Sequence, residues 1–115
     1  MRSKEEVEKY LKELIEKIKI FDVVIEDRKE FYELQKELEI TQSSCKEEII
    51  KLTYKNYYKG PIEDSINKGE YWEFGKTIKK TEVYIKINKG LQNKSVICIS
   101  FHKAKHKMTY PLKSK

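Results

Sequence analysis

The chain has 115 residues, of which 38% are hydrophobic and 38% are charged, and its formal net charge is +6. This length suffices for one domain, residues 1–115, with a single modest core. No apolar run approaches the roughly 20 residues of a membrane-spanning helix, which excludes an integral membrane protein of the helical kind. The polar start, Met1 to Glu6, lacks the apolar stretch of a signal peptide, so we expect a cytoplasmic protein.

The two cysteines, Cys45 and Cys98, show none of the CxxC or Cys/His spacings that bind zinc. We expect both thiols to be reduced and mostly buried, as in a cytosolic protein. The acidic residues form no metal-binding cluster along the sequence either. The sequence therefore predicts no metal requirement and no cofactor.

Charge is distributed unevenly along the chain. Residues 1–50 carry 10 Lys or Arg and 14 Asp or Glu, a net of −4, whereas residues 51–115 carry 15 Lys and 5 Asp or Glu, a net of +10. A basic region raises the encounter rate with phosphate polymers and the affinity for them. Lysine enrichment that serves solubility alone is the alternative. The asymmetry favours an anionic partner. A membrane surface is not expected as that partner, because membrane binding would need a basic amphipathic helix and the helical half of the chain is the acidic one.

The first half of the chain predicts helices and one short strand. Ser3 and Glu6 form a capping-box pattern in front of a helix at about residues 4–19, where apolar residues recur at helical spacing. Residues 20–25 are rich in β-branched side chains and predict a strand. Two further helices are expected, the second capped by Asp27 and the third by Ser43 or Ser44.

After residue 53 the hydrophobic period changes to two, which is typical of strands. Residues 70–74, 82–87 and 95–102 alternate, and the Gly/Asn-rich turn at 88–94 joins the last two runs in an antiparallel hairpin. The tail that follows Pro111, Lys113 to Lys115, is expected to fray at its end. This order predicts an α+β domain, with N-terminal helices packed on one face of a C-terminal antiparallel sheet.

Side chains alternate across a strand, so each predicted strand has two faces. The apolar set is expected to contact the helices and contains Trp72, Phe74, Val83, Ile85, Ile87, Ile97, Ile99 and Phe101. The opposite face would then collect the polar residues Glu73, Tyr84, Lys86, Ser100 and His102.

This polar face has the groups that cleave RNA without a metal, a reaction that needs a base, an acid and cations. His102 can act as acid or base because histidine titrates near neutral pH, and Glu73 is the complementary carboxylate. Lys59 and Lys86 would stabilise the phosphorane, and Tyr84 would orient the phosphate or donate to it. The alternative for His102 is a strand-end histidine without a catalytic role.

Seven aromatic residues lie between positions 54 and 84, interleaved with lysines. Bases of single-stranded RNA stack on aromatic rings while lysines hold the phosphates. Trp72 and Phe74 are expected in the core. The candidates for RNA contacts are Tyr57, Tyr58, Tyr71, Lys86, Lys105 and His106. The alternative for His106 is a solvated residue of the tail without a contact to RNA.

The order and spacing of four segments resemble the MqsR family of toxins: Asn56 to Lys59, Trp72-Glu73, Glu82 to Ile87, and Ile97 to His102. The resemblance covers roughly residues 5–102. It implies a RelE-like α+β fold and a ribosome-independent mRNA endoribonuclease of a type II toxin–antitoxin system, neutralised by a cognate antitoxin protein.

The family motif maps onto Lys59, Glu73, Tyr84 and His102 as catalytic residues. The prototype of the family has glutamine at the position of Glu73 and lysine at that of His102. These differences leave the assignment of acid and base open but not the location of the site. The tail from Lys103 to Pro111 extends past the prototype's end.

The sequence thus predicts cleavage of single-stranded mRNA by 2′-hydroxyl attack, leaving a cyclic phosphate and a 5′-hydroxyl. Its partners would be single-stranded RNA and an antitoxin, which could cover the basic face or add a strand to a sheet edge. The resemblance favours the edge. Two alternatives are a non-catalytic single-stranded RNA-binding module and a basic interaction protein that docks an acidic partner.

Overall fold

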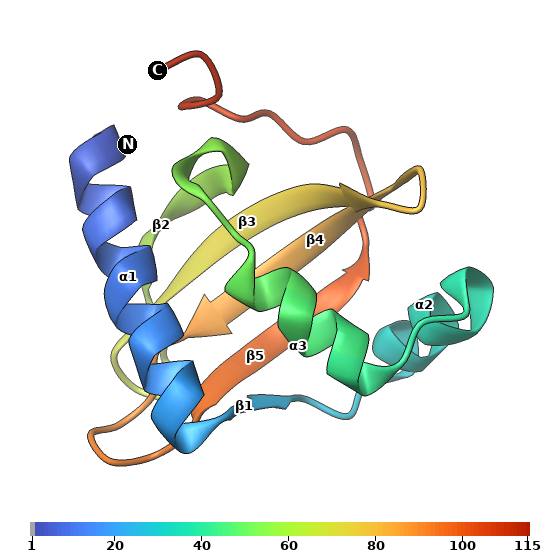
Figure 1. Ribbon diagram of the computed structural model, residues 1–115, viewed down its shortest axis with the longest axis horizontal. Coiled ribbons are helices and arrows are strands. Elements are labelled where there is room, and N and C mark those ends of the chain that lie inside the picture. Colours follow the sequence, from blue (N-terminus) through green and yellow to red (C-terminus); the bar gives the residue numbers. More distant parts are fainter. Residues whose placement is uncertain (1) are drawn as a thin grey trace.

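Three α-helices, one short 3-10 helix and five strands make up the computed structural model, which describes residues 2–115 (Figure 1). In chain order they are α1 (Lys4–Phe21), β1 (Val23–Ile25), α2 (Lys29–Leu38), α3 (Gln42–Ile50), η1 (Tyr54–Asn56), β2 (Tyr57–Glu63), β3 (Glu70–Ile78), β4 (Thr81–Asn88) and β5 (Val96–Lys103). The predicted α+β class is confirmed. Among the described residues, no helix is both long and apolar enough to span a membrane.

Helix α1 starts at the predicted capping box. The Ser3 hydroxyl accepts a hydrogen bond from the Glu6 backbone N–H at 3.2 Å, and the Glu6 carboxylate accepts one from the Ser3 N–H at 3.1 Å. These two bonds satisfy backbone donors that have no partner inside the helix.

The other two helices begin at residues that differ from the predicted ones. Helix α2 has Arg28 as its N-cap, without a side-chain hydrogen bond, so the prediction of Asp27 is wrong. Helix α3 is capped by Thr41, whose hydroxyl accepts from the Ser44 N–H at 3.0 Å. The Ser44 hydroxyl, at the N3 position, accepts a hydrogen bond from the Thr41 N–H at 3.1 Å, which explains why Ser44 resembles a cap in the sequence.

The sheet order is β1-β5-β4-β3-β2, and β4 pairs with both neighbours in antiparallel orientation, as predicted. The C-terminal strands β2 to β5 thus form the predicted antiparallel sheet, but β1 joins it parallel to β5, so the whole sheet is mixed rather than antiparallel. A hairpin imposes antiparallel pairing only on strands that follow each other in sequence, and β1 and β5 are the most distant strands in the chain. Strand β2 was not predicted, because Gly60 and Pro61 interrupt its alternation.

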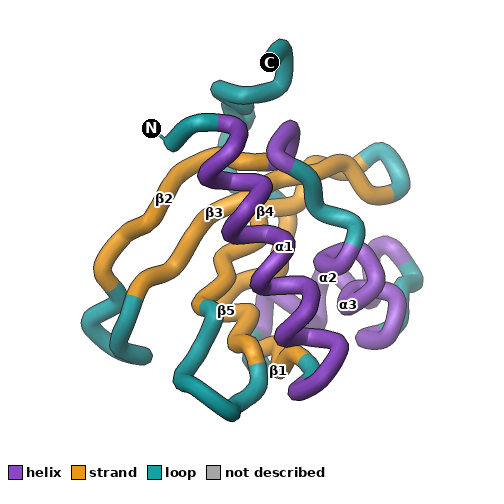
Figure 2. The backbone as a smooth tube through the Cα atoms, turned by 60° about the vertical axis from the view of Figure 1, so that its left-hand side comes forward, coloured by secondary structure: helices purple, strands orange, loops and turns teal. Residues whose placement is uncertain are grey.

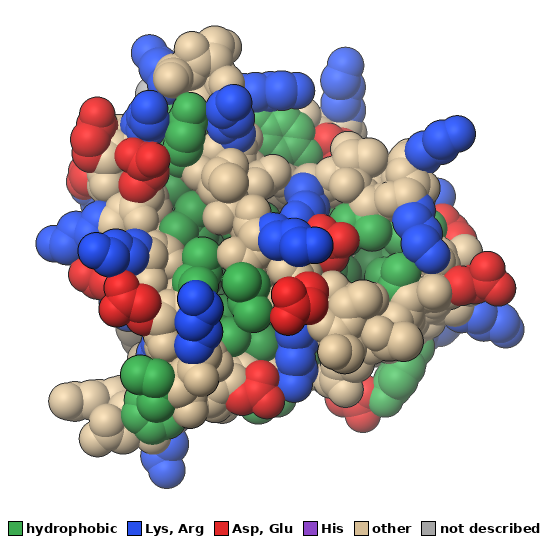
Figure 3. Space-filling model, viewed as in Figure 1, with side chains coloured by type: hydrophobic (Ala, Val, Ile, Leu, Met, Phe, Trp, Pro, Cys, Tyr) green, Lys and Arg blue, Asp and Glu red, His purple; other side chains and the backbone are tan. Residues whose placement is uncertain are grey.

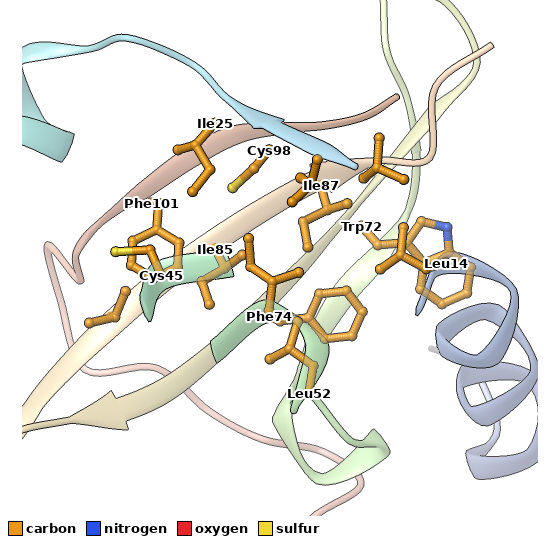
Figure 4. Close-up of a cluster of buried hydrophobic side chains, with 14 of the residues drawn as sticks. Leu14, Ile25, Cys45, Leu52, Trp72, Phe74, Ile85, Ile87, Cys98 and Phe101 are labelled. Atoms are coloured by element: carbon orange, nitrogen blue, oxygen red, sulfur yellow. The ribbon is translucent and has the colours of Figure 1, made fainter. Parts of the chain in front are cut away.

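Helices α1 and α3 lie across the same face of the sheet, and α2 packs beside β5 (Figures 1 and 2). The core between these layers contains Trp72, Phe74 and the β4 side chains predicted to be buried (Figure 4). Both cysteines are free and buried there, as expected. Burial raises the pKa of the Cys45 thiol to about 11, so this thiol stays protonated at neutral pH.

Strand β5 contains a bulge that shifts its alternation. Lys86 lies opposite Ser100, but the next residue, Ile87, lies opposite Cys98, so Ile99 is an extra residue on β5. Before the bulge, Val96 and Cys98 belong to the core, and Ile97 does not. The predicted grouping of Ile97 and Ile99 with Phe101 is therefore wrong: Phe101 alone of the three joins the main core cluster, and Ile99, although only 5% exposed, lies outside it.

The segment after β5 is also ordered against the rest of the protein. Met108 is 4% exposed and Leu112 is 2% exposed. The segment is therefore packed on the domain up to Leu112, the residue directly before the three that are expected to fray.

Candidate nucleic-acid site

The strand register brings the predicted polar residues together on the face opposite the helices. Glu73 on β3 lies opposite Lys59 on β2 and opposite Lys86 on β4. Tyr84, two residues before Lys86, lies opposite His102 on β5. Residues two apart on a strand share a face, so these five side chains form one cluster, called here the candidate site.

A cavity of about 400 Å³ opens at this cluster. The four predicted catalytic residues line it together with Tyr58, Lys86, Ser100, Lys105 and His106. Its volume is in the range of pockets that hold small ligands, and every residue that lines it has a polar or charged side chain.

The Tyr84 hydroxyl donates a hydrogen bond to the Glu73 carboxylate. Burial raises the pKa of Tyr84, and the hydrogen bond and negative charge of Glu73 raise it further. The phenol therefore stays protonated at neutral pH and acts as a hydrogen-bond donor rather than as a base.

His102 is oriented by two contacts. Its Nδ1 lies 2.9 Å from the carbonyl oxygen of Lys103, and its ring stacks on Tyr84 with centroids 5.2 Å apart and planes at 29°. In the neutral ring Nδ1 is then the donor to the carbonyl, because a carbonyl oxygen can only accept. Nε2 is left as the atom that can exchange a proton with a substrate.

The two strand lysines of the site lie over aromatic rings. The ammonium nitrogen of Lys59 is 5.0 Å from the ring centroid of Tyr58, and that of Lys86 is 4.3 Å from that of Tyr71. Such contacts position a cation without neutralising it. Across residues 2–115, neither ammonium group forms an ion pair with a carboxylate, so both charges can act on an anion.

The three tyrosines predicted to contact bases have different positions. Tyr58 lines the cavity, whereas Tyr71 is half-buried and lies under Lys86 without lining it. Tyr57 is 1% exposed and packs edge-to-face on Trp72 and Phe74, so the prediction that it contacts bases is wrong. Tyr57 and Tyr58 are neighbours on β2 and therefore point to opposite faces.

Arg28 and Glu30 also line the cavity, although no sequence pattern indicates this. They lie at the start of α2, which reaches the cavity only because α2 packs beside β5. The Arg28 guanidinium donates to the Glu26 carboxylate at 2.8 and 3.0 Å, and Glu30 pairs with Lys105 at 3.8 Å. No local motif could have identified these residues, because their proximity is purely tertiary.

Comparison of the chain with protein-family models, with curated proteins and with solved structures gave no match. The described residues contain no group of three His, Cys, Asp or Glu side chains that could hold a metal ion. The function of the candidate site must therefore be inferred from its own geometry and from the sequence motifs that it contains.

Proposed function

We propose that the protein is an endoribonuclease that cleaves single-stranded mRNA, independently of the ribosome, through attack of a 2′-hydroxyl on the adjacent phosphate. The observation that carries this proposal is the convergence of His102, Glu73, Lys59 and Lys86 in one cavity, next to the donor hydroxyl of Tyr84. These are the groups that such a reaction needs, and they come from four different strands.

The positions of these groups support the following reaction. The Glu73 carboxylate takes the proton of the 2′-hydroxyl, whose oxygen bonds to phosphorus while the bond from phosphorus to the 5′-oxygen breaks. Protonated His102 gives its Nε2 proton to the leaving 5′-oxygen. The products are a 2′,3′-cyclic phosphate and a 5′-hydroxyl. The reverse assignment, with His102 as base and Glu73 as acid, uses the same atoms.

The cations and Tyr84 act on the phosphate itself. Lys59 and Lys86 stabilise the charge that develops on the phosphorane oxygens, and this needs no metal because both proton transfers come from side chains. The Tyr84 hydroxyl donates to a phosphate oxygen once Glu73 has accepted the substrate proton and no longer competes for it.

The motif resemblance supports the same location, since the positions implied by the MqsR family, Lys59, Glu73, Tyr84 and His102, all line the cavity. We therefore propose a cytoplasmic toxin with a RelE-like fold that is inhibited by an antitoxin. The sheet ends in two edges, and the edge at β1 is only three residues long. The Val23 N–H in β1 already donates to Asp22, so we place the antitoxin strand at β2.

The test is cleavage of a single-stranded oligoribonucleotide by the purified protein in EDTA, with end-group analysis of the products. We expect cyclic phosphate and 5′-hydroxyl ends, and no cleavage at a nucleotide that lacks its 2′-hydroxyl. Binding without cleavage would instead support the RNA-binding module. If the protein neither binds nor cleaves RNA, the remaining alternative is a basic interaction protein that docks an acidic partner.

A further inference from the structure

The residues after β5 form a strap, residues 104–112, that Glu82 holds against the sheet. The Ala104 N–H donates to the Glu82 backbone carbonyl at 2.9 Å. The Glu82 carboxylate accepts from the Met108 N–H at 3.1 Å and from the Tyr110 hydroxyl at 2.7 Å. Figure 1 shows the strap leaving the end of β5, passing the β3–β4 turn and ending near the start of α1.

The surface of the sheet leaves room for this strap at Gly75. Glu82 and Tyr84 are two apart on β4, so both side chains lie on the face opposite the helices. Gly75 lies opposite Tyr84 on β3, and a Cβ there would be 2.6 Å from the Tyr110 hydroxyl and 2.7 Å from the Met108 sulfur. The absent side chain at Gly75 is thus what lets the strap approach.

The two ends of the short segment between Ala104 and Met108 are fixed by the same residue. Lys105 and His106 belong to this segment, are exposed, and line the candidate site. The ammonium of Lys105 lies 3.8 Å from Glu30 of α2. The segment therefore spans from the sheet to α2 along one side of the cavity.

We propose that Glu82 is a positioning residue of the candidate site: by holding both ends of this segment, it places Lys105 and His106 to bind an RNA phosphate next to the scissile one. This inference rests on the proposed function. Glu82 itself does not contact RNA, because both of its carboxylate oxygens are occupied by the strap.

Two variants of the full chain loosen the strap to different degrees. Glu82→Gln replaces one acceptor oxygen by a donor, and Tyr110→Phe removes one hydrogen bond but keeps the ring. Glu47→Gln, an exposed carboxylate on α3, is the matched control. Urea unfolding of each variant establishes that it folds before RNA is tested.

The kinetic readout separates positioning from chemistry. For an oligoribonucleotide we expect the KM of both strap variants to rise roughly tenfold, which is the scale of one hydrogen bond to a charged group, with kcat nearly unchanged. The salt slope of binding should fall by about one for each phosphate that the variant no longer neutralises. The same substitutions made in the Lys105→Ala, His106→Ala background should have no further effect on KM.

A second readout uses the histidines, since His102 and His106 are the only two in the chain. A 2′-deoxy oligonucleotide, which binds but cannot react, should shift the ring NMR signals of both in the wild-type protein. In the strap variants we expect the shift of His106 to shrink and that of His102 to persist.

The outcomes are distinguishable. If the wild-type protein cleaves RNA but the strap variants keep its KM and its His106 shift, the role of Glu82 is refuted and the proposed function stands. If the strap variants change KM and kcat together, and if their effects add to those of the Lys105 and His106 substitutions, the strap stabilises the fold and does not position these two residues. If the wild-type protein neither binds nor cleaves, the proposed function fails, and the positioning role fails with it.

Discussion

Replacing Asp64 by asparagine should destabilise the protein in a pH-dependent way, because this carboxylate closes the turn between β2 and β3. Asp64 is 6% exposed and accepts hydrogen bonds from the backbone N–H groups of Ile66 and Asn67 at 3.0 and 2.9 Å. The side-chain amide of Asn88 donates to it at 2.9 Å. Burial alone would raise the pKa of Asp64, but these hydrogen bonds together lower it to about 2 from an ordinary 3.8.

The magnitude follows from this difference in pKa. A group whose pKa is lower in the folded state stabilises that state when it is ionised, and a lowering from 3.8 to about 2 corresponds to about 2 kcal/mol of unfolding free energy. The contribution is complete above about pH 5, falls as the pH drops through the unfolded pKa, and is lost below the folded one. About half of it should remain at pH 3.

Urea denaturation of the wild-type protein and Asp64→Asn at pH 7 and pH 3 measures this effect. We expect the variant to lose about 2 kcal/mol at pH 7 and about half as much at pH 3. Glu63→Gln, a neighbouring exposed carboxylate, is the control and should change little at either pH. An equal loss for Asp64→Asn at both pH values would refute the reasoning, since the ionised carboxylate would then not be the source of the stabilisation.

The other predictions concern the site and the strap. His102→Ala and Tyr84→Phe should each lower RNA cleavage roughly 100-fold or more with unfolding unchanged, the scale of positioned acid–base groups, and near-wild-type turnover in both would remove these assignments. Lys59→Glu should weaken RNA binding in a filter or anisotropy assay. Lys12→Glu on α1 should not, because acidic and basic side chains are interspersed on the helix-covered face (Figure 3); equal losses would contradict a directional charge effect. Gly75→Ala should lower the thermal unfolding temperature, since its Cβ would lie within 2.8 Å of three strap atoms, and an unchanged temperature would show that the strap yields freely.

The features that the sequence predicted correctly depend on neighbouring residues. The capping box at Ser3 and the β4–β5 hairpin are set by residues within one turn or one loop of each other. Alternation along β4 was enough to place Tyr84 and Lys86 on one face, because a regular strand has a period of two.

The features that it missed depend on interactions between distant segments. Nothing local specifies that β1 pairs with β5 or that Arg28 reaches the cavity. The strap was missed for the same reason: Met108 and Tyr110 stand in a lysine-rich tail, and their partner Glu82 lies 26 and 28 residues earlier.

The bulge at Ile99 shows how a site can depend on an irregularity that the sequence hides. If pairing continued regularly from Ile87 opposite Cys98, Phe101 would lie opposite Tyr84 on the open face, and His102 would point into the core. The extra residue reverses this, burying Phe101 at 1% exposure and stacking His102 on Tyr84. The run Val96 to Phe101 is apolar apart from Ser100, so its pattern has too little contrast to reveal where the alternation shifts. The predicted face was correct for Ser100, Phe101 and His102 and wrong for Ile97, and the bulge separates Ile97 from the other three.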